Sequence, residues 1–193
     1  MDVTDSSATR SPAATRLLER LVEGRSSLDG PAAAISPLAR QARGDGAWRR
    51  VVTGEAIGHA VHPFLTDLPI GFWASASLLD VVGGPGAAVA ARRLVAAGLA
   101  SAPAAALTGL AEYDSLGARP RRVAAVHAAL NVASLALYAA SWAARPRRQG
   151  LGAALALGGL SVSGVSAYLG GHLAIGEKVG TTTETWPRPS TPS

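Results

Sequence analysis

Four long apolar segments with almost no charged residues divide the chain, at residues 64–82, 94–111, 123–144 and 151–175. Each is close to the roughly 20 residues that a helix needs to cross the hydrocarbon core of a bilayer. A helix of a soluble bundle carries a polar face, and the third and fourth segments show almost none. The pattern therefore predicts an all-α integral membrane protein, an up-and-down four-helix bundle whose transmembrane domain covers residues 54–176.

The segments outside this domain are polar. Residues 1–12 are rich in Ser, Thr and Asp and are predicted to be a disordered tail, and residues 177–193 a flexible C-terminal tail. Residues 13–53 predict a basic helical arm. It begins with a short amphipathic helix over residues 13–23, and a second basic stretch at 35–52 is broken by Pro37 and by a turn at 44–46. The arm either lies on the membrane surface or is a helical extension without a partner.

Composition excludes several classes of function. The chain contains no cysteine, which rules out disulfides, thiol catalysis and cysteine-ligated iron–sulfur clusters. The net charge is +5, but the arginines lie in the arm and in short loops, where they suit anionic lipid headgroups rather than nucleic acid. No phosphate-binding loop, nucleophile–base pair or paired carboxylate site is recognisable. Whether the protein is an enzyme stays open.

The four histidines fall at one end of the predicted bundle. In an up-and-down topology, the start of the first and third helices and the end of the second and fourth share one side. His59 and His62 precede the first helix, His127 lies early in the third and His172 late in the fourth. A lone histidine near a membrane interface is usually only an interfacial polar residue. Four on one side indicate a membrane-embedded haem or metal site.

The first hypothesis is a haem b protein that serves electron transfer. Helices one and three are diagonal in such a bundle, so His62 and His127 are the best pair of axial ligands, with His172 as the other candidate. Arg119, Arg121 and Arg122 lie at the same side and suit haem propionates. The partner would be a quinone or a separate redox protein.

Two alternatives remain. A compact site of His62, His127 and His172, with His59 as a further ligand, suits Zn²⁺ or copper in a metal-binding or metal-transport protein. The third hypothesis is a non-catalytic membrane module that holds a soluble redox protein.

Asp67 is a candidate to orient a ligand imidazole. Glu112 is expected to be a solvated loop charge.

Four stretches resemble a bacterial membrane family known as domain of unknown function 2231. They are residues 58–73 (GHAVHPFLTDLPIGFW), 108–113 (TGLAEY), 122–131 (RVAAVHAALN) and 168–173 (YLGGHL). The resemblance implies a four-helix membrane domain with histidines at helix ends. Some relatives continue into a Rieske iron–sulfur domain, which implies redox traffic; here a Rieske partner would be a separate protein. Ala60 stands where the family often has proline.

Loop charges give the expected orientation. Basic residues near the helix ends number slightly more on the histidine side, and the basic arm adds to them. The positive-inside rule then favours a cytoplasmic histidine face. We expect a multi-pass protein of the bacterial plasma membrane with both termini in the cytoplasm.

Overall fold

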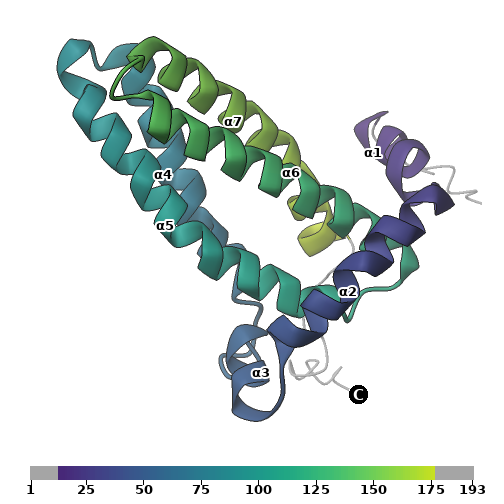
Figure 1. Ribbon diagram of the computed structural model, residues 1–193. Helices are drawn as coiled ribbons and strands as arrows, with labels where there is room; N and C mark the ends of the chain where they lie inside the picture. The colour runs from purple at the N-terminus through teal and green to yellow at the C-terminus, as the bar shows by residue number, and fades with distance from the viewer. Residues whose placement is uncertain (1–12, 177–193) are drawn as a thin grey trace, which may run out of the picture.

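The computed structural model describes residues 13–176, so the two predicted tails lie outside the described residues. Its body consists of four long helices, α4 (His62–Val82), α5 (Ala88–Tyr113), α6 (Ala118–Ala144) and α7 (Gln149–Gly171) (Figure 1). No strand occurs in residues 13–176. All four helices are long and apolar enough to cross a membrane. This confirms the predicted all-α class with four membrane-spanning helices.

The helix ends follow local sequence signals. Pro63 stands in the first turn of α4, where its missing N–H leaves no helical hydrogen bond unmade. The α4–α5 turn contains Gly84 at φ 64°, a left-handed conformation that favours glycine, and a short 3₁₀ turn, η3 (Pro85–Ala87). Helix α5 runs unbroken through Pro103. Helix α7 continues into a π-helical turn, η4 (His172–Gly176).

The bundle is built from two hairpins. Helix α4 packs mainly on α5 and α6 mainly on α7, while fewer contacts join the hairpins through α5–α6 and α4–α7. Helices α4 and α6 are therefore diagonal and run in the same direction (Figure 1). At the centre, the rings of Trp73 and Tyr138 stack with centroids 4.2 Å apart.

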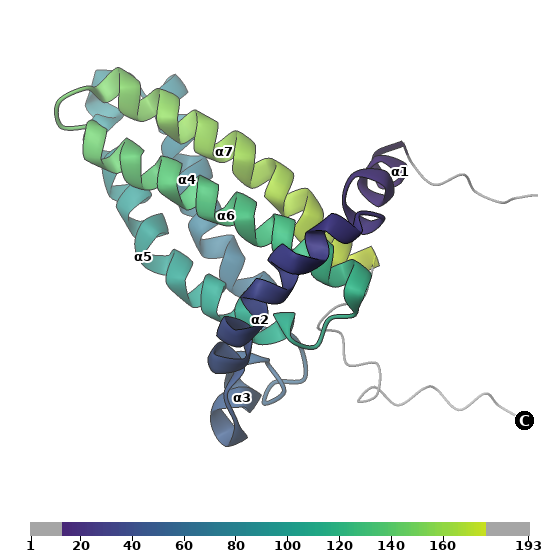
Figure 2. The same cartoon turned by 45° about the vertical axis from the view of Figure 1, so that its right-hand side comes forward.

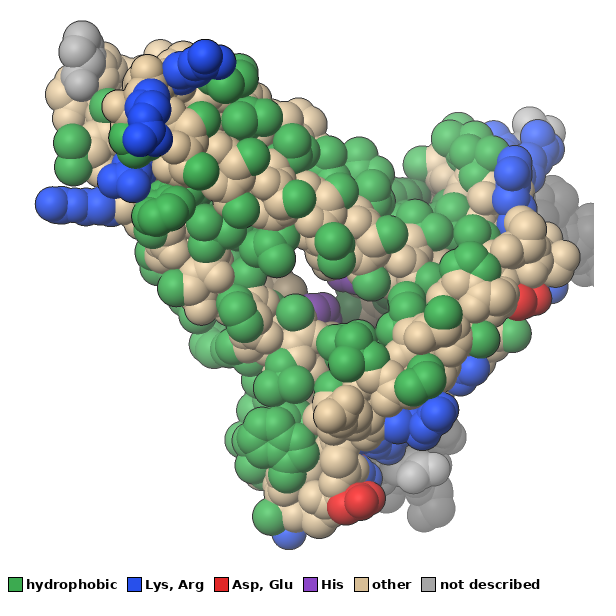
Figure 3. Space-filling model, viewed as in Figure 1, with side chains coloured by type: hydrophobic (Ala, Val, Ile, Leu, Met, Phe, Trp, Pro, Cys, Tyr) green, Lys and Arg blue, Asp and Glu red, His purple; other side chains and the backbone are tan. Residues whose placement is uncertain are grey.

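A buried ion pair closes the end of the bundle that lies away from the histidines. Arg145, just after α6, donates to both carboxylate oxygens of Asp80 in α4, at 2.8 and 2.5 Å. The two side chains are only 1% and 2% exposed. In Figure 3, basic side chains gather toward the two ends of the bundle and hydrophobic side chains cover its middle, as expected of a protein in a bilayer.

The arm packs against the histidine end of the bundle. It comprises α1 (Ala13–Leu18), the π-helical η1 (Glu19–Glu23), the 3₁₀ turn η2 (Ser26–Leu28), α2 (Asp29–Arg43) and α3 (Gly46–Val52). Helix α2 crosses the ends of α5 and α6 (Figure 2). Leu18 and Ala39 are buried in a core cluster with residues of α5, α6 and α7.

The predicted break at Pro37 is wrong, whereas the turn at 44–46 is confirmed. Pro37 lies inside α2, whose buried face of Ala32, Ser36, Ala39 and Ala42 follows helical spacing. Packing of this face against the bundle offsets the hydrogen bond that proline cannot donate. Gly44 and Gly46 both have positive φ, which ends the helix.

Candidate functional site

His62 is the first residue of α4 and lies against α5. Its Nδ1 lies 2.8 Å from the backbone carbonyl oxygen of Ala105. A carbonyl only accepts, so Nδ1 carries the proton and Nε2 holds the free lone pair. Gly109, one turn further along α5, leaves room for the ring: a Cβ there would come within 2.7 Å of Cε1 of His62. The imidazole thus sits directly on the backbone of the neighbouring helix.

His127 in α6 lies against α7 in the same way. Its Nδ1 donates to the carbonyl of Ser166, again at 2.8 Å, and a Cβ on Gly170 would come within 3.0 Å of Cε1 of His127. Here Nε2 accepts a hydrogen bond from Nδ2 of Asn131 at 3.0 Å. The hydroxyl of Ser166 donates to Oδ1 of Asn131 at 2.8 Å, which fixes the orientation of that amide.

The two imidazoles meet across the diagonal of the bundle. Their ring centroids are 6.4 Å apart and their planes are nearly perpendicular, at 84°. Figure 3 shows an opening between α2, α5 and α6, with histidine side chains at its wall. Two imidazole groups from separate hairpins therefore face each other beside a gap in the packing.

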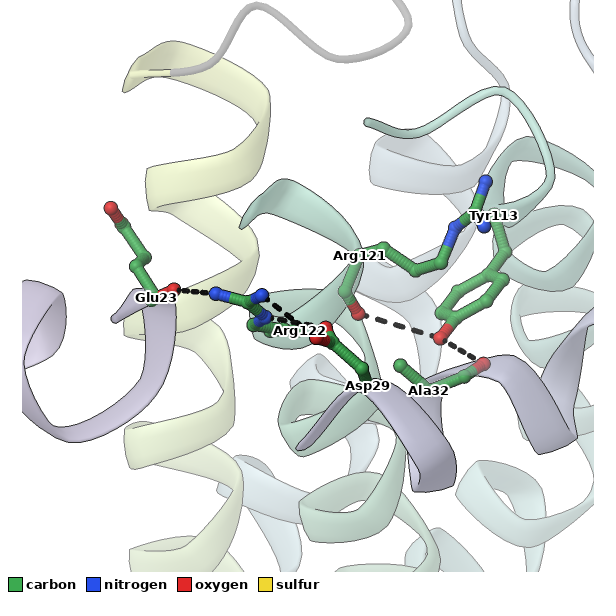
Figure 4. A network of polar contacts seen from close by, with 6 residues as sticks. All are labelled: Glu23, Asp29, Ala32, Tyr113, Arg121 and Arg122. Atoms are coloured by element: carbon green, nitrogen blue, oxygen red, sulfur yellow. Dashed lines mark hydrogen bonds and ion pairs between the residues drawn. The ribbon is translucent and has the colours of Figure 1, made fainter. Parts of the chain in front are cut away.

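His172 has a different partner. Its Nε2 lies 2.9 Å from Oε1 of Glu23, in the arm. Arg122, one of the arginines considered for propionates, also faces the arm: its Nε and Nη2 bond both carboxylate oxygens of Asp29, at 2.6 and 2.9 Å, and Nη1 donates to the carbonyl of Glu23 (Figure 4). Hydrogen bonds from Arg122 hold the pKa of the Asp29 carboxyl below its usual range.

Other contacts in Figure 4 tie the arm to the same end. The hydroxyl of Tyr113 donates to the carbonyl of Ala32 at 2.8 Å. Arg121 is also engaged, because its Nη2 donates to the carbonyl of Leu116 at 2.7 Å. The structure thus uses the side chains of His172, Arg122 and Tyr113 to build the junction between arm and bundle, whereas Arg121 holds the loop between α5 and α6.

The remaining candidates lie at the surface. His59 is exposed, with its Nδ1 near the carbonyl of Ala60 at 3.2 Å, and Arg119 and Asp67 are exposed as well. Within residues 13–176, no group of three or more His, Cys, Asp or Glu side chains is arranged to hold a metal ion. The structure brings together His62 and His127, and not all of the predicted histidines.

Glu112 was misjudged from the sequence. Helix α5 continues to Tyr113, which carries Glu112 into the bundle rather than into a loop. Its carboxyl group lies near the backbone N–H of His62, and its Oε1 is buried without a partner among the described residues. The signal was available, since Glu112 follows Gly109 by one helical turn and so shares its face.

Comparisons with known proteins add a family. A family model described as "Predicted membrane protein (DUF2231)" matches residues 58–183, a range that includes all four long helices and leaves the arm outside. No curated protein and no solved structure matches the chain. The description names no activity, so function has to be argued from the site.

Proposed function

The chain belongs to the DUF2231 family of predicted membrane proteins, and for it we propose that His62 and His127 hold the iron of a haem b that serves electron transfer. The observation that carries the proposal is the spacing of the two rings. Imidazoles that bind one metal from opposite sides, at the usual nitrogen–metal distance of about 2 Å, have centroids roughly 6 Å apart. The centroids of His62 and His127 are separated by 6.4 Å.

The hydrogen bonds of the rings also suit ligation. A metal-binding histidine typically donates its other ring N–H to a carbonyl or carboxylate, which fixes the tautomer and the ring orientation. The Nδ1 atoms of His62 and His127 do so, to Ala105 and Ser166. Ligation through Nε2 of His127 requires the amide of Asn131 to turn away, because Asn131 now donates to that atom.

The number of ligands favours haem over a bare metal ion. Zinc sites usually need three or four protein ligands, and the described residues hold no group of three. Haem supplies four nitrogens itself and needs only two axial ligands. A metal ion held by His62, His127 and His172, with His59 nearby, remains the second candidate. It would require His172 to leave Glu23.

A haem held by both His62 and His127 would have no open coordination position on its iron. It would pass single electrons rather than bind oxygen or substrate. A membrane quinone or a separate redox protein is the partner that fits a protein embedded in lipid. Arg119 and Arg122 lie at the same end of the bundle and could pair with the haem propionates, although Arg122 is paired with Asp29 in this structure.

We also propose that the histidine face and both termini are cytoplasmic, because the arm and the loops on that side are basic.

An absorption spectrum tests the proposal. Protein made with ample haem and purified in detergent should show sharp reduced-minus-oxidised bands. His62→Ala and His127→Ala should each abolish the six-coordinate spectrum, while His59→Ala, at an exposed position, should leave it unchanged. Folded but colourless protein would refute haem binding. Stoichiometric zinc or copper in that sample, lost in His127→Ala, would favour the second candidate. If the protein contains neither haem nor metal, the remaining hypothesis is a membrane module that binds a separate protein.

A further inference from the structure

The two hairpins of the bundle follow one design. Residues of α4 and α6 correspond at a constant offset in the sequence, and so do residues of α5 and α7 at a second constant offset. Three pairs match between α4 and the segment formed by α6 and the residue after it: His62 with His127, Trp73 with Tyr138, and Asp80 with Arg145. Four pairs match between α5 and α7: Val95 with Ala156, Gly98 with Gly159, Ala105 with Ser166, and Gly109 with Gly170.

Matching residues have matching environments. Both histidines donate from Nδ1 to the corresponding carbonyl of the next helix, at the same 2.8 Å. Each imidazole rests on the corresponding glycine, Gly109 or Gly170. The same holds at the centre of the bundle, where a Cβ on Gly98 would meet the ring of Trp73, and one on Gly159 the ring of Tyr138.

Part of the sequence identity between the halves falls at or beside these positions. The tripeptide Ala-Val-His occurs at 60–62 and again at 125–127, and Gly-Leu occurs at 98–99 and 159–160. Other matched pairs are identical apolar residues, such as Leu65 with Leu130 and Leu94 with Leu155, and several have diverged, as Trp73 and Tyr138 show. The histidine and the two glycines on which the rings rest are the shared residues with a specific structural role.

Three of the matched pairs also touch each other. His62 faces His127, Trp73 stacks on Tyr138, and Asp80 pairs with Arg145. In a two-fold arrangement, a residue meets its own equivalent only at the axis. Because α4 and α6 run in the same direction, a pseudo-two-fold axis passes along the bundle between these three pairs.

We infer that the bundle is a fused pair of equivalent hairpins, and that its axial site takes a flat metal-carrying tetrapyrrole to which each hairpin gives one equivalent histidine. This inference rests on the proposed function and adds the ligand's orientation. The metal lies on the axis, and the line between the two imidazole nitrogens crosses it. The plane of the ligand then stands along the bundle, with one hairpin on each face and an edge toward the opening between α5 and α6.

Matched variants of the full-length protein test the equivalence. Gly109→Ala and Gly170→Ala place a Cβ against His62 and His127, at 2.7 and 3.0 Å from Cε1. Each should lower haem affinity by about 10–100-fold, the usual effect of disturbing a group that orients a ligand. Gly71→Ala and Gly164→Ala are the controls, because a Cβ at either position meets nothing within 4 Å. An effect in only one of the two test variants would overturn the inference.

Orientation gives an independent readout. In oriented bilayers, electron paramagnetic resonance should show the haem plane parallel to the membrane normal. A haem that is bound by both histidines but lies flat in the membrane plane would overturn the inference while leaving the proposed function intact.

If the protein binds no haem, the proposed function and the ligand of the axial site are both refuted, and the equivalence of the two hairpins is tested by stability instead. Gly109→Ala and Gly170→Ala should then lower the melting temperature to similar extents. In His62→Ala and His127→Ala backgrounds, respectively, the same glycine changes should have no such effect, because the ring that the Cβ meets is gone. A melting-temperature loss restricted to one half, or unrelieved by the matched histidine change, would overturn the inference. These backgrounds also serve if a glycine variant alone fails to fold.

Discussion

The hairpin of α4 and α5 and the hairpin of α6 and α7 share a backbone plan but are held together differently. The second is joined by side-chain hydrogen bonds: Ser134 bonds the carbonyl of Gly159 and the hydroxyl of Ser163, and Ser141 donates to the carbonyl of Gly152. The matched residues in the first hairpin are Pro69, Ala102 and Ala76, which have no side-chain hydrogen-bonding group. There Trp73 fills the space and donates to the carbonyl of Val95.

The difference shows which features the shared plan requires. In both halves an aromatic ring packs on a glycine of the neighbouring helix, whereas the side chains that donate interhelical hydrogen bonds differ, as helices that associate by close packing and polar contacts allow. The glycines under the rings and the Nδ1–carbonyl bonds of the histidines do not vary between halves. The side chains around the two histidines do vary. His127 is the more firmly held imidazole, because Asn131 and Ser166 also bond its ring.

The largest expected effect comes from breaking the ion pair that joins the halves. Arg145→Met leaves the buried carboxylate of Asp80 without its main partner and should lower the free energy of unfolding by roughly 3–5 kcal/mol. The measurement is denaturant unfolding in detergent, with the exposed Arg148→Ala as the control. Asp80→Leu/Arg145→Met should recover most of the loss, because it removes both buried charges.

Exchanging the two charges sharpens this result. If the positions are related by the two-fold axis, Asp80→Arg/Arg145→Asp should be more stable than Arg145→Met. Recovery should be incomplete, since Ser141 and Gln149 support the pair only in its present orientation. A swapped protein less stable than the single variant would argue that the halves are not interchangeable here.

The next effect concerns the central glycines. Gly98→Ala puts a Cβ 2.2 Å from Nε1 of Trp73, and Gly159→Ala puts one 2.9 Å from Cε2 of Tyr138. Overpacking of this kind typically costs about 1–3 kcal/mol. We expect both variants to unfold more easily, with the greater loss for Gly98→Ala, whose clash is closer. Thermal melting against Gly71→Ala decides the order, and equal stability of Gly98→Ala and that control would contradict the packing described here.

The features that could be predicted from the sequence are those set by local patterns, and the features that could not are those set by contacts between residues far apart in the chain. Hydropathy gave the spanning segments, because lipid requires about 20 apolar residues whatever the neighbours are. Alternating direction placed His62 and His127 on diagonal helices. The contact of His172 with Glu23 was beyond such reasoning, because it joins residues far apart in the sequence, and the local pattern of the arm does not indicate where on the bundle it docks.

The repeat left a trace that sequence reasoning missed. Ala-Val-His occurs twice, but Trp73 and Tyr138, or Asp80 and Arg145, are not similar enough to be aligned by inspection. They are recognisable as equivalents only once the structure shows them in contact. Pro37 was overrated as a helix breaker because its local cost ignores the packing of α2 on the bundle.

A smaller effect is expected from making the halves alike around their histidines. Thr66 and Ala105 of the first half match Asn131 and Ser166 of the second. Asn131→Thr/Ser166→Ala should lower unfolding free energy by about 1 kcal/mol, since hydrogen bonds between membrane helices are worth roughly 0.6 kcal/mol on average. The reverse change, Thr66→Asn/Ala105→Ser, should cost less or stabilise. The same stability change in both directions would show that the hydrogen bonds of Asn131 and Ser166 are not what distinguishes the halves.

The smallest effect lies at the polar junction of the arm with α6 and η4, which has no counterpart in the first half. Arg122 and His172 bind the arm through Asp29 and Glu23, whereas their matched residues, Ile57 and Ala111, are apolar. The pKa of Asp29 is lower in the folded protein because Arg122 donates to its carboxylate. The pair therefore stabilises the docked arm fully above the usual Asp pKa of about 4, and that contribution is lost as pH falls through the lower, folded value.

Hydrogen exchange of residues 19–28, corrected for its intrinsic pH dependence, should rise in acid in the wild-type protein. Asp29→Asn should already show raised exchange at neutral pH and a weaker dependence on pH. The same pH profile in both proteins would mean that the arm is held by its apolar contacts, Leu18 and Ala39 in the core cluster, and that the polar junction adds orientation without adding stability.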